Sequence, residues 1–282
     1  MSTLILAAVL LGAVFHATWN AIIKAQDDHS LAALVVAVFA GLFGIPMMLA
    51  LPAPPPAAWP FVIASSLIHV GYFALVGFAY RSADLGVAYP LTRGSAPLMT
   101  ALIAFLFLGE ALAWNGWIAI VTLATGIVML SADALIRGGL TKRAAMAVAT
   151  NACVIVAYTL TDGLGARVTE SGLVYGAWLL AGTGFCVFFF ALLMRRQAFF
   201  REAKKIWLPG LIAGSLVLPS YGIALWAMMQ APIGLVAALR ETSVLFAAII
   251  GARFFREPFG PRRWIALILI VCGIILLKLP GA

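Results

Sequence analysis

The chain has 282 residues, of which 64% are hydrophobic and only 10% charged, and its formal net charge is +8. A soluble globular domain carries roughly 25% charged residues. The composition therefore excludes a soluble protein of ordinary type and predicts a polytopic membrane protein. The positive charge does not point to nucleic acid, because basic residues in such proteins mostly flank helices on the cytoplasmic side. We expect a small-molecule substrate and the lipid bilayer as partners, and no cofactor.

Ten stretches are apolar enough to cross a bilayer, for which a helix needs about 20 residues. The connections between them are short and leave no room for a catalytic module outside the membrane, so we expect that the protein is not an enzyme. The sequence predicts an all-α membrane protein with spanning helices over residues 4–24, 31–51, 60–80, 86–108, 114–131, 144–163, 172–194, 207–229, 233–254 and 263–279.

The second half of the chain repeats the first. Arg93 is followed by Glu110, Trp117 and Gly126, and 147 residues later Arg240 is followed in the same spacing by Glu257, Trp264 and Gly273. We predict two repeats, residues 1–135 and 140–282, with five helices each. Because five is odd, the second repeat enters the membrane with opposite polarity. Secondary transporters commonly have such inverted repeats, with a midplane site at the repeat interface.

The distribution of basic residues predicts the orientation. Fourteen of the 18 Lys and Arg residues lie in the loops after odd-numbered helices, two lie in the even loops and termini, and the other two are Arg93 and Arg240. The positive-inside rule then places the odd loops in the cytoplasm and both termini outside it. We expect a multi-pass protein of the cell (inner) membrane.

Several segments resemble the drug/metabolite transporter superfamily, in particular its EamA-like ten-helix exporters. They are His16-Ala17-Thr18-Trp19-Asn20, Pro97 with Gly109-Glu110, Arg240-Glu241-Thr242-Ser243 and Arg256-Glu257. The resemblance implies two EamA-like repeats and export of small metabolites such as amino acids through a cavity lined by helices 1, 3, 4, 6, 8 and 9. The first segment resembles a subgroup of permeases associated with phosphonate use. Many ten-helix relatives are thought to have cytoplasmic termini, opposite to the charge distribution here, which we follow.

Arg93 and Arg240 are the first candidates for a substrate site. A guanidinium inside hydrocarbon costs roughly 3 kcal/mol on insertion scales, so it usually faces a cavity or a partner. Arg93 could clamp a substrate anion or pair with Glu241, which could also carry a coupling proton. We predict that Arg240 is the arginine coupled to Glu241, and that Arg93, on a helix loosened by prolines, moves or meets substrate. These three charges leave +1, which favours an anionic or zwitterionic substrate.

Polar and aromatic residues on three helices complete the candidate site. His16, Trp19 and Asn20 share one face of the first helix by their i, i+3, i+4 spacing. Tyr158 is the repeat counterpart of Trp19, and Tyr89 precedes Arg93. His69 and Tyr72 form an i, i+3 pair on the third helix. Substrate contact and interhelical hydrogen bonding are both open for these side chains. The substrate-binding candidates are His16, Trp19, Asn20, His69, Tyr72, Tyr89, Arg93, Tyr158, Arg240 and Glu241.

Other polar residues favour structural roles. We expect Asp162 to pair with Arg167 near the interface, and Glu110 and Glu257 to anchor the helices that follow them. Three cysteines lack metal-ligand spacing, so neither a metal site nor a disulfide is expected, and we interpret them as small core residues. They are Cys153, Cys186 and Cys272.

These features predict a secondary transporter of small anionic or zwitterionic metabolites, amino acids or related organic acids, that exports them by alternating access at a midplane cavity. The alternatives are multidrug or cation efflux, a lipid-linked sugar permease or a phosphonate permease. Four-helix cation exporters use an acidic residue in the first helix, where this chain has His16 and Asn20. An intramembrane enzyme is disfavoured because HExxH and DDxxD motifs are missing. The coupling ion and the oligomeric state stay open, and a monomer is compatible with the sequence.

Overall fold

The computed structural model describes residues 1–82, 85–130, 141–254 and 260–278, without the side chains of residues 74, 76–90, 143 and 144. Within these ranges the chain is helical and forms no strand. With residues 233–254 counted as one span, eight spans are long and apolar enough to cross a membrane, and two shorter helices bring the number in the described ranges to ten. The all-α prediction is confirmed.

The helices follow the predicted order. In the first half they are α1 (Thr3–Lys24), α2 (His29–Ala50), the 3-10 turn η1 (Pro56–Ala58), α3 (Trp59–Ser82), α4 (Leu85–Leu108) and α5 (Trp114–Met129). In the second half they are α7 (Lys142–Thr169), α8 (Gly172–Lys205), α9 (Trp207–Met228), α10 (Ile233–Arg240), α11 (Ser243–Phe254) and α12 (Pro261–Leu276).

Polar residues at the edges of the apolar stretches start several helices. The Ser2 hydroxyl accepts a hydrogen bond from the Ile5 N–H at 3.3 Å, and the Asp28 carboxylate accepts one from the Leu31 N–H at 3.0 Å. Such N-caps satisfy backbone donors that have no partner inside the helix. Here they also mark where the chain enters the apolar region.

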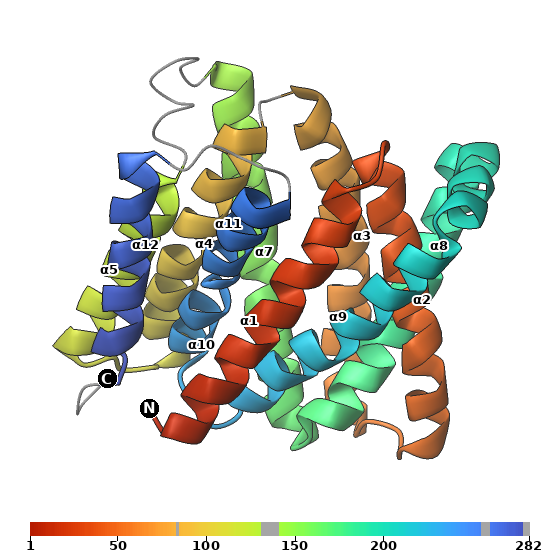
Figure 1. Ribbon diagram of the computed structural model, residues 1–282. Coiled ribbons are helices and arrows are strands. Elements are labelled where there is room, and N and C mark those ends of the chain that lie inside the picture. Colours follow the sequence, from red (N-terminus) through yellow and green to blue (C-terminus); the bar gives the residue numbers. More distant parts are fainter. Residues whose placement is uncertain (83–84, 131–140, 255–259, 279–282) are drawn as a thin grey trace.

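Helices of one half pack on their counterparts from the other. The pairs α2–α8 and α5–α12 are each made of repeat-related helices, and they lie on opposite sides of the bundle (Figure 1). The α5–α12 crossing is close because Gly126 and Gly273 lie in it. A Cβ added at Gly126 would stand 2.9 Å from the Ala266 carbonyl oxygen, and one added at Gly273 would meet Leu123. The duplicated glycines therefore let the two helices approach closely.

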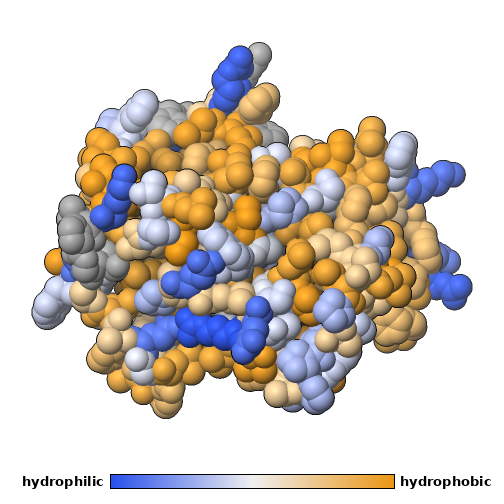
Figure 2. Space-filling model, turned by 90° about the horizontal axis from the view of Figure 1, so that it is seen from below, coloured by the Kyte–Doolittle hydropathy of each residue, from blue (hydrophilic) through white to orange (hydrophobic). Residues whose placement is uncertain are grey.

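The outer surface of the bundle is apolar. Leu49, Phe107 and Leu193 expose 76%, 77% and 83% of their surface. Seen from the side that carries the N-terminus, most of the surface is hydrophobic and hydrophilic residues form scattered patches (Figure 2). In water such a surface would drive association, whereas in a bilayer it contacts lipid. The cysteines follow this pattern, because Cys153 and Cys272 are exposed and only Cys186 is partly buried. Interpreting all three as core residues was wrong.

The helix α8 is longer than predicted. It continues to Lys205 across a kink at Arg195, whose φ of −149° is not helical, so the basic segment after residue 194 is helix rather than loop. At its end the Lys205 ammonium bonds to the Asp27 carboxylate in the α1–α2 connection, and this hydrogen bond lowers the pKa of Asp27. The pair connects the end of α8, which is the seventh predicted span, to the loop after the first span. The positive-inside rule predicts that both lie on the same side of the membrane.

The broken helix is the ninth, not the fourth. The helix α4 runs without interruption past Arg93, although Pro97 lies inside it, whereas the predicted ninth span divides into α10 and α11. At the break the Thr242 hydroxyl and the Thr242 N–H both donate to the Leu239 carbonyl, at 2.6 and 3.1 Å. These bonds over three residues replace the usual four-residue pattern. The prolines therefore do not break α4 at Arg93, although Pro97 has no N–H to donate to the Arg93 carbonyl, and the predicted loosening stays a prediction.

Candidate functional site

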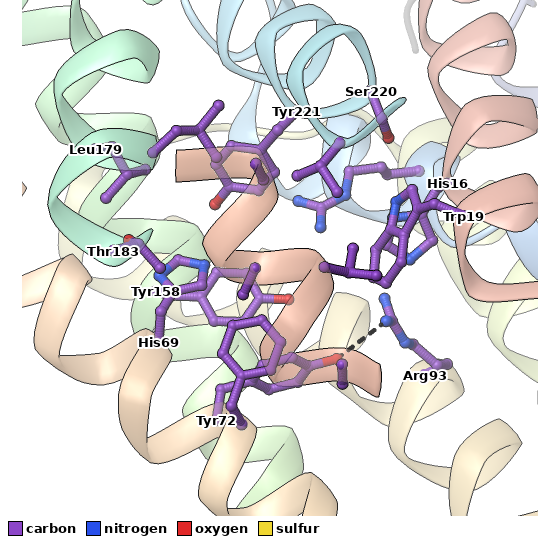
Figure 3. Close-up of a pocket in the computed structure, with 18 residues that line it drawn as sticks. His16, Trp19, His69, Tyr72, Arg93, Tyr158, Leu179, Thr183, Ser220 and Tyr221 are labelled. Carbon is purple, nitrogen blue, oxygen red and sulfur yellow. Dashed lines mark hydrogen bonds between the residues drawn. The ribbon is translucent and has the colours of Figure 1, made fainter. Parts of the chain in front are cut away.

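A cavity of about 80 Å³ lies at the centre of the bundle, between helices of both halves. Figure 3 shows aromatic and polar side chains converging on it from α1, α3, α4, α7, α8 and α9. Seven of the ten predicted site residues line it. The polar and aromatic lining residues are His16, Trp19, His69, Tyr72, Phe73, Arg93, Tyr158, Thr183, Ser220, Tyr221 and Arg240.

Arg93 is paired with Glu241. The Nη1 of Arg93 donates to both carboxylate oxygens of Glu241, at 3.0 and 3.1 Å. Its Nη2 donates to the Tyr72 hydroxyl at 3.4 Å, the bond that Figure 3 marks. Arg93 and Glu241 are only 2% and 4% exposed. The pair joins α4 to the break between α10 and α11, and so joins the two repeats. The prediction that Arg240 is the arginine coupled to Glu241 was wrong.

Arg240 has a different environment. Its guanidinium carbon lies 5.0 Å from the ring centroid of Tyr221, a cation–π contact. In the described ranges no carboxylate forms an ion pair with it. Arg240 is 6% exposed and lines the cavity. It is thus a buried cation whose charge is available to a ligand.

On α1, the predicted polar face reaches the cavity only in part. His16 and Trp19 line it, with their ring centroids 4.8 Å apart in an edge-to-face contact. The His16 Nε2 is buried and has no hydrogen-bond partner among the described residues. Asn20 does not line the cavity, because its amide donates back to the His16 carbonyl at 2.8 Å. Its side chain is hydrogen-bonded to the backbone of its own helix.

An aromatic wall faces the two arginines. His69 of α3 stacks on Tyr158 of α7, with centroids 4.6 Å apart, and Tyr72 meets the same tyrosine edge to face at 5.8 Å. The His69 Nδ1 is fixed by the Ser65 carbonyl at 2.9 Å. Tyr89 belongs to α4, but its side chain lies outside the described part of the structure.

Thr183, Ser220 and Tyr221 line the cavity but are missing from the sequence-based candidates. The Thr183 hydroxyl is buried and has no partner in the part of the chain described, while Ser220 donates to the Gly12 carbonyl at 2.9 Å. Tyr221 follows Tyr72 by 149 residues, close to the 147-residue repeat. The repeat could therefore have indicated Tyr221.

Asp162 was predicted to pair with Arg167 near the interface, and this was wrong. It is 1% exposed, and both of its oxygens accept hydrogen bonds from tyrosine hydroxyls, Oδ1 from Tyr175 at 2.8 Å and Oδ2 from Tyr221. Asp162 lies four residues after Tyr158, so a helical face shared with this cavity residue was a signal for its position.

The guanidinium of Arg167 binds elsewhere. It forms an ion pair with Glu110 at 2.6 Å and donates to the carbonyls of Met228 and Ala231 at 2.8 and 3.1 Å. The other oxygen of Glu110 accepts a hydrogen bond of 2.8 Å from the N–H of Ile233, which is the first residue of α10. Glu110 therefore anchors the helix that carries Arg240 rather than the helix that follows it.

A second hollow, of about 400 Å³ and mostly apolar, lies between α2, α8 and α9. Its lining includes Gly172, the first residue of α8, and Trp226, near the end of α9. These two helix ends lie on the side of the N-terminus (Figure 1). Tyr221 lines both this hollow and the central cavity. Its side chain therefore contributes to the wall between them.

The EamA-like transporter family model matches residues 3–132 and again residues 143–279. The chain belongs to this family. It is a multi-pass membrane transporter with the two-repeat fold, and the predicted resemblance is confirmed. Glu257, the counterpart of Glu110, lies outside the described residues.

Relatives of this EamA-like transporter match parts of the chain. The nicotine metabolites export pump subunit NepA of Paenarthrobacter nicotinovorans is 31% identical over 72 residues, which cover 26% of this chain and 62% of the relative. The multidrug resistance protein EbrB of Bacillus subtilis (strain 168) is 29% identical over 99 residues, 35% of this chain and 82% of that protein.

A solved structure, described as a crystal structure of a protein, matches with a TM-score of 0.74 and 21% sequence identity. The match covers 99% of this chain and 96% of the other. At this identity the match supports the fold.

Proposed function

We propose that this EamA-like transporter exports small anionic or zwitterionic metabolites, such as amino acids or related organic acids, across the cell (inner) membrane. The observation that carries the proposal is Arg240, a buried guanidinium that lines the central cavity and faces a tyrosine ring instead of a carboxylate. A guanidinium fork matches the geometry of a carboxylate or phosphonate. A ligand anion at this position supplies the partner that the protein does not.

The charge of the site supports the same class of substrate, with one revision. Arg93, Arg240 and Glu241 together carry a charge of +1. Asp162 also lies in this region, because it is hydrogen-bonded to the cavity residue Tyr221. With all four groups ionised, the charges cancel, which suits a zwitterion. With a proton on Asp162 the site carries +1, which suits an anion.

Uncharged polar groups around the cavity fit a polar substrate as well. The His16 Nε2 and the Thr183 Oγ1 are both buried without hydrogen-bond partners in the described ranges, and both residues line the cavity. A buried polar atom without a partner costs about 1–3 kcal/mol. A polar ligand that bonded to these two atoms would remove that cost, so both atoms favour a polar substrate over an apolar one.

We propose that breaking and re-forming the Arg93–Glu241 pair controls alternating access to the cavity. A cavity of about 80 Å³ is smaller than an engineered protein cavity of about 150 Å³ that binds benzene, so a metabolite needs a wider site. A substrate carboxylate can compete with Glu241 for Arg93, and release of Glu241 separates α4 from the α10–α11 break. The apolar hollow behind Tyr221 then offers an exit toward the side of the termini, which the basic loops predict to be extracytoplasmic.

Cation efflux is the second candidate. Two observations favour it: the relatives include proteins named for multidrug resistance, and the aromatic wall with Asp162 behind it could hold an organic cation. Against it, Arg240 already occupies the face of Tyr221, and a second guanidinium, that of Arg93, lines the same small cavity. Both arginines repel a cation, so the anionic substrate is the better fit.

Thermal unfolding of the purified protein with a ligand panel tests the proposal. The panel contains zwitterionic amino acids, organic acids, phosphonates and quaternary ammonium dyes. A ligand at 100 times its Kd stabilises the folded state by about 2.7 kcal/mol. We expect the unfolding temperature to rise with members of the first three groups. Stabilisation by the dyes alone would support cation efflux and contradict the proposal.

A further inference from the structure

Asp162 is a buried carboxylate held by neutral groups. It lies within α7, is 1% exposed, and each of its oxygens accepts a hydrogen bond from a tyrosine hydroxyl, Tyr175 on one side and Tyr221 on the other. Among the ion pairs of the described residues, none includes Asp162. An acidic residue inside a membrane helix without a cationic partner is costly and usually has a function.

The basic residue nearest in sequence is already engaged. Arg167 binds Glu110 and two backbone carbonyls, so Asp162 does not serve to neutralise it. Glu241, by contrast, would have to break its bonds to Arg93 in order to accept a proton. Asp162 can gain and lose a proton without breaking an ion pair, and this difference separates the two carboxylates.

Three of the helices packed on α7 contribute groups that face Asp162. The helix α3 contributes Ser65 and His69, α8 contributes Tyr175, and α9 contributes Tyr221. Behind the Tyr221 ring lies Arg240 of α10. Of these groups, His69, Tyr221 and Arg240 line the central cavity, so the carboxylate is one side chain away from the proposed substrate position.

We propose that Asp162 is the proton-binding site of this transporter, and that its protonation turns the Tyr221 hydroxyl toward a substrate anion at Arg240. A hydroxyl both donates and accepts hydrogen bonds. When Oδ2 carries a proton, it donates to the Tyr221 oxygen, and the Tyr221 proton needs another acceptor. A ligand carboxylate at Arg240 is that acceptor.

The charges balance in this scheme. One proton passes from water to Asp162, the charge of the site rises by one, and one anionic group of the substrate matches it. Proton and anion therefore bind together and leave together, so a substrate gradient directed out of the cell, rather than the proton gradient, drives export in this scheme. The substrate half of this inference rests on the proposed function, whereas the proton half rests on the surroundings of Asp162 alone.

Infrared pH-difference spectra of the purified protein in lipid test the proton half without any substrate. A protonated buried carboxyl group gives its own carbonyl stretching band, and we expect such a band to appear as the pH falls. Asp162→Asn should abolish it. Glu202→Gln is the matched control, because Glu202 is also buried, at 7% exposure, but lies in α8 away from the cavity. An unchanged band in Asp162→Asn overturns the proposal.

A second variant covers the case in which Asp162→Asn does not fold. Tyr221→Phe keeps the carboxylate and removes one of its two tyrosine partners, so the frequency of the band should shift. A band that is insensitive to Tyr221→Phe would contradict the link to Arg240. If the band behaves as expected but no anionic ligand stabilises the protein, the proposed substrate class fails and the proton site stands.

Discussion

Glu241 accepts two hydrogen bonds from one nitrogen of Arg93, although the two residues are 148 positions apart in the chain. Repeat symmetry would place a glycine where Glu241 stands, because its counterpart is Gly94. A Cβ at Gly94 would lie 2.6 Å from a methyl carbon of Val128 on α5, so a side chain does not fit there. The acidic residue is confined to the second repeat, where the helix breaks, and it joins that break to α4.

This pair should show strong coupling when its members are replaced. Removing one partner of a buried ion pair leaves an uncompensated charge and costs about 3–5 kcal/mol, whereas replacing both by apolar residues is often neutral. We expect Arg93→Met and Glu241→Leu to lower stability strongly, and the double variant to recover most of the loss. Denaturant unfolding of the four proteins measures this. Additive losses would mean that the two residues do not act as a pair.

Glu110 should stabilise the start of α10. Its carboxylate accepts the Ile233 N–H and pairs with Arg167, and because the pair is partly exposed, we expect Glu110→Gln to cost roughly 1 kcal/mol. Glu170→Gln is the control, since Glu170 is exposed just after α7. Equal melting temperatures of both variants would show that the anchor contributes nothing measurable.

The contact between α4 and α10 depends on Gly234. A Cβ at this position would stand 2.6 Å from the Ala101 Cα, so Gly234→Ala must push the two helices apart. Overpacking of this kind costs about 1–3 kcal/mol, and it should also displace the arginines, which these helices carry. Gly222→Ala is the matched control, because no atom lies within 4 Å of its added Cβ and alanine favours a helix by up to about 1 kcal/mol. If Gly234→Ala is as stable as Gly222→Ala, the close approach is not needed.

The length of the apolar stretches predicted the ten spans well, apart from the division of the ninth into α10 and α11, because burial in lipid requires long apolar segments with internally satisfied backbones. The repeat of Arg93 and Arg240 likewise identified two cavity residues before any coordinates. The repeat boundaries, 1–135 and 140–282, stay predictions from this spacing. The orientation of the repeats in the membrane stays a prediction from the basic loops.

The sequence left open whether Arg93 pairs with Glu241, an alternative that the structure confirms, but it could not predict the partners of Asp162. Spacing shows which side chains share a helix face, but Arg93 and Asp162 find their partners on other helices, at distances that depend on packing. Proximity in the chain suggested Arg240 for Glu241 and Arg167 for Asp162, and both were wrong. The break at Thr242 was missed for a related reason, since a threonine hydroxyl bonded to a backbone carbonyl leaves no clear mark in an apolar stretch.

Orientation in the membrane can be measured directly. The basic loops predict that the C-terminus lies outside the cytoplasm. A phosphatase fused after Ala282 is active only in an oxidising compartment, so we expect an active fusion, while a fluorescent protein that matures in the cytoplasm should stay dark at the same position. A stable but inactive phosphatase fusion would reverse the predicted topology.

Ligand binding by Arg240 variants tests the central claim most directly. The anionic or zwitterionic ligand that gives the largest thermal stabilisation is titrated into the wild-type protein, Arg240→Gln and Arg240→Lys. We expect Arg240→Gln to lose at least about 1.5 kcal/mol of binding free energy, the lower value for a hydrogen bond to a charged group, which is more than tenfold in affinity. The affinity of Arg240→Lys should lie between those of the wild type and Arg240→Gln. An Arg240→Gln protein that stays folded and binds the ligand as tightly as the wild type would contradict the account.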